Sequence, residues 1–175
     1  MNSVVMVTGH RPQKLGPNYN FRELIEFSKN WLDIIKPQYV IQGGALGFDL
    51  AIAAAASQLK IPYTMAIPFP SQPKKWENTD YKIWLKAKER ATRVHIVSDD
   101  LAPTAILSDY ALAMYKRNTW MLEEVSTFKN ALVLGLWNGE VRSGTFSAIS
   151  IAKDLNLPII NLYPEYTKFK TSLVF

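Results

Sequence analysis

The stretch Val4-Val5-Met6-Val7-Thr8-Gly9-His10-Arg11 decides the fold, because an apolar, strand-like run leads directly into a glycine-bearing turn. The same order returns where Tyr39-Val40-Ile41 leads into Gln42-Gly43-Gly44-Ala45-Leu46-Gly47-Phe48-Asp49. In open α/β sheets, ligands bind at the carboxyl ends of strands, where glycine lets backbone N–H groups and a helix N-terminus approach a phosphate. The two turns therefore predict one anion-binding crevice.

Short apolar runs alternate with segments of helical length along the whole chain. We expect strands at 4–8, 39–42, 63–67, 93–97, 131–136 and 159–162, and helices at 21–35, 48–59, 80–91, 108–127 and 144–155. Because parallel strands need crossover connections, this order predicts an α/β fold: a single Rossmann-like domain over residues 1–175 with a mostly parallel, doubly wound sheet and helices on both faces. The tail 163–175 is an extra edge strand, a dimer contact or a frayed end.

The composition bounds the class of protein. A chain of 175 residues with 48% apolar and 12% aromatic residues can bury a core, and the absence of cysteine excludes disulfides and thiolate chemistry. The start of the chain has no signal-peptide pattern, and apolar stretches such as Leu50 to Ala56 are too short to cross a bilayer. We expect a cytoplasmic protein with no membrane partner, no metal and no resident cofactor.

The formal charge of +5 favours an anionic partner, either a small molecule or nucleic acid. The excess is concentrated between Lys74 and Arg93, where Lys82, Lys86 and Arg90 share one face of the expected helix. This face is either solvated or binds single-stranded nucleic acid with help from Trp76 or Trp84.

Three turns carry the candidate chemistry. Arg11 offers a planar fork for phosphate, and His10 can donate to a phosphate oxygen. Gly43, Gly44 and Gly47 crowd around the start of a helix and predict an anion nest, while Asp49 either satisfies free N–H groups there or accepts from ribose hydroxyls. After the run Ala131 to Leu136, the third turn carries Asn138-Gly139 and then Ser143-Gly144-Thr145, where Ser143 or Thr145 caps a helix.

Two loops and one helix add residues around the crevice. The loops 11–20 and 68–79 follow strands and should overhang the ligand with Arg11, Lys14, Gln72, Lys74 and Trp76. On the expected helix 108–127, Arg117 and Asn118 face either a ligand or a neighbouring subunit. We predict no catalytic residue. The candidate ligand-binding residues are Thr8, Gly9, His10, Arg11, Gly43, Gly44, Ala45, Gly47, Asp49, Arg117, Asn118, Asn138, Gly139, Ser143, Gly144 and Thr145.

Four motifs in this order resemble the SLOG superfamily, and within it the YpsA-like branch, a family of unknown function that is also found in phages. They are 7–12, 43–49, Arg117-Asn118 with Met121, and 137–139 with 143–145. The resemblance implies a fold that binds nucleotides or nucleotide-derived ligands through its glycine turns, and it makes a homo-oligomer plausible. Among distantly similar proteins, Lonely Guy enzymes cleave a ribose-phosphate from a base and DNA-processing protein A binds single-stranded DNA.

The chain departs from the Lonely Guy pattern at one decisive position. That pattern places a glutamate three residues after a glycine-threonine pair, whereas Ala148 stands there in this chain. An N-glycosidase needs a carboxylate to stabilise oxocarbenium charge or to activate water. We therefore expect a protein that senses or sequesters an ADP-ribose-like or phosphoribosyl compound. The alternatives are an N-glycosidic hydrolase that uses Asp49 or His10, and a single-stranded nucleic-acid binder.

Overall fold

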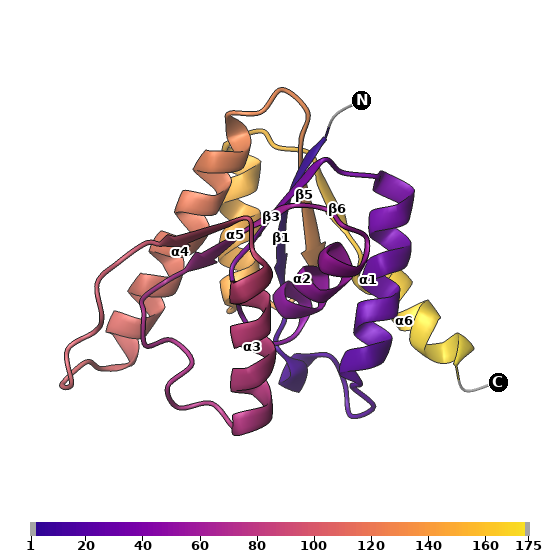
Figure 1. Ribbon diagram of the computed structural model, residues 1–175. Helices are drawn as coiled ribbons and strands as arrows, with labels where there is room; N and C mark the ends of the chain where they lie inside the picture. Colours follow the sequence, from indigo (N-terminus) through magenta and orange to yellow (C-terminus); the bar gives the residue numbers. More distant parts are fainter. Residues whose placement is uncertain (1–2, 174–175) are drawn as a thin grey trace.

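A computed structural model describes residues 3–173, and a parallel sheet runs through its centre (Figure 1). The strands of this described part are β1 (Val4–Gly9), β2 (Tyr39–Gln42), β3 (Tyr63–Ile67), β4 (Arg93–Ile96), β5 (Ala131–Leu136) and β6 (Ile159–Asn161), in the order β4-β3-β2-β1-β5-β6. Every neighbouring pair is parallel. The predicted doubly wound α/β fold is confirmed.

Helices cover both faces of the sheet (Figure 1). On one face lie α1 (Phe21–Ile35), α2 (Phe48–Gln58), α3 (Asn78–Arg90) and α6 (Tyr163–Ser172), and on the other lie α4 (Leu107–Ser126) and α5 (Gly144–Asp154). A short 3-10 helix, η1 (Pro12–Lys14), follows β1. Within residues 3–173, no helix combines the length and apolar character needed to cross a membrane.

The direction of winding reverses next to β1. The chain builds β1, β2, β3 and β4 outward in turn, and α4 then carries it back across the sheet to β5 on the other side of β1. The loops that follow β1 and β5 consequently leave the sheet in opposite directions. Such a switch point opens a crevice at the carboxyl ends of the two strands.

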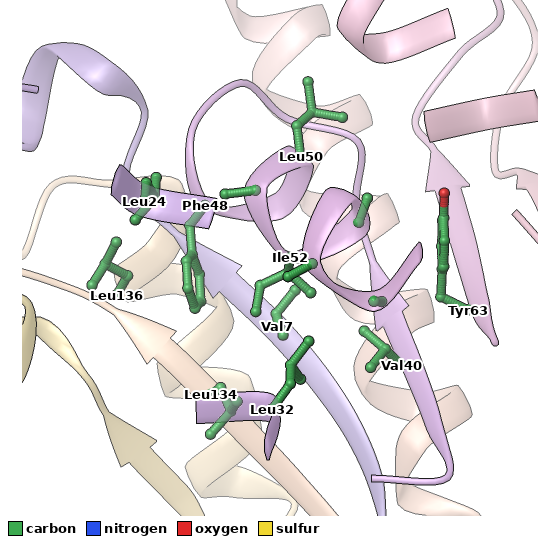
Figure 2. Close-up of a cluster of buried hydrophobic side chains, with 14 of the residues drawn as sticks. Val7, Leu24, Leu32, Val40, Phe48, Leu50, Ile52, Tyr63, Leu134 and Leu136 are labelled. Atoms are coloured by element: carbon green, nitrogen blue, oxygen red, sulfur yellow. The ribbon is translucent and has the colours of Figure 1, made fainter. Parts of the chain in front are cut away.

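The alternation of side chains along β1 divides the core into two halves. Val7 lies among Phe48 and Ile52 of α2 and Leu134 and Leu136 of β5, as Figure 2 shows, and Val5 belongs to the same cluster. Val4 and Met6 point to the opposite face and pack in the cluster formed with α4 and α5. The four alanines 53–56 let α2 lie close to the sheet, and three of them are fully buried.

The tail of the chain differs from the sequence prediction. Residues 163–172 form α6, which is neither an edge strand nor a frayed end, and Tyr166 packs edge-on against Phe27 of α1 with ring centroids 5.3 Å apart. Phe169 lies 5.5 Å from the same ring. Pro164 in the first turn favours a helix start, and the i, i+3 spacing of the two aromatic side chains places them on the face that meets α1. Residues 174 and 175 lie outside the described part.

The remaining boundaries agree closely with the expectations. The helix expected to start at Asp80 starts at Asn78, and the strand expected to reach Val97 ends at Ile96. Differences of this size are ordinary at the ends of elements, where hydrogen bonds fray.

Candidate functional site

A pocket of about 790 Å³ lies at the switch point, between the loops that follow β1 and β5 and the first half of α4. This volume lies within the usual range for small-molecule sites. Most of the residues predicted for ligand binding line it. They are Thr8, Gly9, His10, Arg11, Ala45, Asp49, Arg117, Asn118, Ser143, Gly144 and Thr145.

Five predicted residues do not line the pocket, namely Gly43, Gly44, Gly47, Asn138 and Gly139. The structure adds others that the sequence reasoning did not assign to the site: Gln13, Ala111, Leu112, Met114, Tyr115, Arg142 and Ser147. A sequence signal existed for three of those on α4, because positions 111, 114 and 115 precede Asn118 by seven, four and three residues and so share its face.

The glycine turn after β2 uses its N–H groups internally. The Asp49 carboxylate, through Oδ2, accepts from the backbone N–H of Gly43 at 3.2 Å and of Ala45 at 3.3 Å. The Gln42 side-chain oxygen accepts from the N–H of Gly44 at 2.6 Å. The first of the two roles weighed for Asp49 is therefore the one seen, and these three N–H groups are not open to an anion.

Arg117 joins this turn to α4. Its Nη1 donates to the carbonyl oxygen of Gly43 and lies 3.4 Å from Asp49 Oδ2, and both charged side chains are buried. A Cβ atom on Gly43 would lie 1.5 Å from Arg117 Nη1, so only glycine leaves room for the guanidinium. Gly47 caps the start of α2 at φ +94°, a conformation that glycine adopts at low cost.

Burial raises the pKa of the Asp49 carboxyl, although Arg117 and the two backbone donors act in the opposite direction. Burial also lowers the pKa of the Arg117 guanidinium, which still remains protonated because its ordinary value lies far above neutrality. The contact with Arg117 and the two backbone N–H donors on Asp49 Oδ2 make this a buried ion pair, in which the loss of one partner leaves the other uncompensated.

His10 is buried at the end of β1 and held in one orientation. Its Nε2 lies 2.6 Å from the side-chain oxygen of Asn138, which also accepts from the Glu140 N–H at 3.0 Å. Because that oxygen accepts, Nε2 carries the hydrogen, and Nδ1 faces Thr145 Oγ1 at 3.5 Å. Burial, with a smaller contribution from the Lys14 charge, lowers the pKa of His10. We therefore describe His10 as a neutral side chain at neutral pH.

The N-terminus of α5 forms one wall of the pocket. Of the two capping residues weighed, Ser143 is the one seen, because its Oγ accepts from the Phe146 N–H at 3.1 Å. Asn118 Nδ2 donates to the Gly144 carbonyl at 3.2 Å. A Cβ atom on Gly144 would meet nothing within 4 Å, so this turn faces open space. The first N–H groups of a helix have no intrahelical acceptor, and they favour an anion.

The other walls differ sharply in character. Arg11 and Arg142 are exposed at the rim, and neither forms an ion pair within residues 3–173. On α4, Leu112 and Tyr115 are about half exposed and Met114 lies beside them, which makes an apolar wall. The described part of the chain holds no cluster of three or more histidine, aspartate or glutamate side chains suited to a metal ion.

Of the two loops expected to overhang the ligand, only the loop 11–20 contributes residues to the pocket. Arg11 and Lys14 line the pocket, whereas Gln72, Lys74 and Trp76 do not. Gln72 is buried beneath α3, where it accepts from the indole N–H of Trp84 at 3.3 Å. Trp76 packs against the core on the same side. The loop 68–79 therefore stabilises α3 and does not cover the pocket.

Replacing Asp49 with asparagine should destabilise the fold strongly, because Arg117 would be left buried without its counter-charge. We expect Asp49→Asn to lower the free energy of unfolding by about 3–5 kcal/mol, measured by urea denaturation at pH 7. The exposed Asp33 on α1 supplies the control, since Asp33→Asn should change it by less than about 0.5 kcal/mol. A loss below about 1 kcal/mol at Asp49 would contradict the structural role.

No family model and no curated protein matches the chain. Solved structures do. DNA processing protein A from Streptococcus pneumoniae superimposes with a TM-score of 0.57 at 17% identity over 90% of this chain and 49% of its own. The Helicobacter pylori protein of the same name, whose structure concerns single-stranded DNA binding, superimposes with a TM-score of 0.55 at 18% identity. The match covers 89% of this chain and 63% of the Helicobacter pylori chain. The chain thus spans about half to two thirds of the length of these proteins.

The molybdenum cofactor carrier protein of Chlamydomonas reinhardtii is also similar, with a TM-score of 0.52 at 15% identity over 99% of this chain and 85% of the carrier. At such identities these likenesses concern the fold alone. The expected distant similarity to DNA processing protein A is confirmed at that level: the chain shares its Rossmann-like architecture with these ligand-binding and DNA-binding proteins.

Proposed function

We propose that the protein binds a nucleotide or a nucleotide-derived ligand, such as an ADP-ribose-like or phosphoribosyl compound, in the pocket between β1, β5 and α4. The observation that carries the proposal is the division of this pocket into a cationic side and an apolar side. Arg11, Arg142 and the N-terminus of α5 suit a phosphate. The Leu112 and Tyr115 side chains suit the face of a base.

Binding without cleavage is supported by the positions of the carboxylates. Ala148, which stands where Lonely Guy enzymes carry glutamate, is fully buried between α5 and the sheet. Asp49 is already bonded to Gly43, Ala45 and Arg117. Neither position supplies a free carboxylate to a glycosidic bond, so a role in sensing or sequestering the ligand is favoured.

The four motifs that resemble the YpsA-like branch of the SLOG superfamily all contribute residues to this one pocket, which supports our proposal that the chain belongs to that branch. We propose a cytoplasmic location, which the cysteine-free composition supports, because the reducing cytosol makes no use of disulfides.

Removing the charge of either exposed arginine at the rim, Arg11 or Arg142, should weaken ligand binding. We expect Arg142→Gln and Arg11→Gln each to raise the dissociation constant for ADP or ADP-ribose about tenfold, the effect of ~1.4 kcal/mol from one charge-assisted hydrogen bond. Isothermal titration calorimetry on the full chain measures this, with Lys86→Gln on α3 as a control of equal charge change. Absence of binding by the unaltered protein at millimolar ligand would refute the proposal.

The second candidate function is binding of single-stranded DNA. Two observations favour it: the Helicobacter pylori protein of similar fold binds single-stranded DNA, and Lys82, Lys86 and Arg90 are exposed on α3. Fluorescence polarisation with a labelled oligothymidine tests it. If α3 binds DNA, replacing these three residues with glutamine should weaken binding strongly and reduce its salt dependence, whereas Arg142→Gln should do neither. Equal effects of both changes would assign DNA to the pocket.

We also propose a homo-oligomer formed through the start of α4. Ile106 and Leu107 are 65% and 88% exposed there, and exposed apolar patches of this kind mark interfaces. Light scattering at about 50 μM should give at least twice the mass of one chain. Leu107→Lys should reduce that mass toward the monomer, and a monomeric unaltered protein would exclude the proposal.

A further inference from the structure

An ion pair lies at the edge of the pocket. Lys14 on η1 lies with its Nζ 2.6 Å from both carboxylate oxygens of Glu140, in the loop that follows β5. Both side chains are about 40% exposed, and the contact lowers the pKa of Glu140. Lys14 lines the pocket and Glu140 does not. We call this pair the latch.

The two partners of the latch are held to different degrees. The Glu140 N–H donates to the Asn138 side chain, and the Glu140 carbonyl accepts from the Trp137 indole at 2.8 Å and from Ser143 Oγ at 3.0 Å. Glu140 is thus fixed through its backbone on both sides. The Lys14 ammonium ends a flexible stem with three freely rotating donors. The lysine is therefore the partner that can move to another anion.

The charges around the pocket show when such a movement is favourable. Arg117 is paired with Asp49 and Lys14 with Glu140, which leaves Arg11 and Arg142 without an ion-pair partner among the described residues. A phosphate monoester carries about −1.5 to −2 at neutral pH, and two arginines balance it. A second phosphate exceeds what the arginines can balance, and Lys14 is the next cation on the lining.

We propose that Glu140 sets the preference of the pocket for diphosphates over monophosphates, because its ion pair with Lys14 keeps this lysine from the ligand until a second phosphate is present. A ligand with two adjacent phosphates draws Lys14 away from Glu140 and is bound by it, whereas a monophosphate leaves the latch closed. Glu140 is a positioning residue here, because it acts through Lys14 and does not touch the ligand. The nucleotide part of this inference rests on the proposed function.

The experiment compares Glu140→Gln with the unaltered full chain by calorimetry, using inorganic pyrophosphate and phosphate, and ADP and AMP. Freeing Lys14 should tighten the dissociation constants of pyrophosphate and ADP about fivefold, the upper range for an exposed ion pair, and leave those of phosphate and AMP within about twofold. Glu165→Gln supplies the matched control, since Glu165 forms an exposed ion pair with Lys168 on α6 and lies outside the pocket lining.

A double-mutant cycle identifies Lys14 as the mediator. Lys14→Gln should weaken pyrophosphate and ADP binding, and in that background Glu140→Gln should have no further effect. A fivefold tightening that persists without Lys14 would overturn the inference, since it would reflect the loss of a negative charge in general. So would equal tightening of mono- and diphosphates, or no change in Glu140→Gln.

The two proposals fail separately. If pyrophosphate binds and responds to Glu140→Gln while neither nucleotide binds, the latch stands and the nucleotide function falls. If ADP and AMP bind equally and neither responds, the nucleotide function stands and the latch falls. Absence of pyrophosphate and ADP binding in both the unaltered protein and Glu140→Gln overturns the latch as well.

Discussion

The buried contact among Arg117, Asp49 and the Gly43 carbonyl is the constraint on which the rest of the site depends. It connects the turn after β2, the start of α2 and the middle of α4 at one place. Since α4 carries the apolar wall of the pocket, this contact also fixes that wall relative to the turn after β2 and the start of α2. A buried charge pair of this kind stabilises little in itself but makes the loss of either partner costly.

The two glycine turns at Gly144 and Gly43 have different structural roles. At Gly144 the absence of a side chain leaves the start of α5 open to the pocket, while at Gly43 it makes room for a neighbouring guanidinium. The first turn suits a ligand and the second supports the protein. Two glycine turns of similar sequence thus leave open space at one place and allow close packing at the other, and only the surrounding side chains distinguish them.

The fold could be predicted from sequence because buried parallel strands are continuous apolar runs, and β1, β3 and β5 are of this kind. The meeting of the turns at 8–11 and 143–145 followed from the rule for strand ends. The occupation of the Gly43 and Gly44 N–H groups did not, because the sequence does not specify the side-chain rotamers that bring Asp49 and Gln42 to them. The contact of Lys14 with Glu140, across 126 positions, has no local signal at all. Helix α6 was not predicted because its aromatic side chains pack against Phe27 of α1, a residue far away in the sequence, so the segment itself carries little sign of this packing.

The reversal of winding at β1 also determines when the pocket forms during folding. His10 and Asn138, which meet beside the pocket, are 128 positions apart, and β1 pairs with β5 along its whole length. Contacts between such distant segments close late, because the entropy of a long loop must be overcome first. The pocket therefore exists only once nearly the entire chain has been synthesised and folded. A ligand bound there would hold the first and last thirds of the chain together, and would stabilise the fold as a whole.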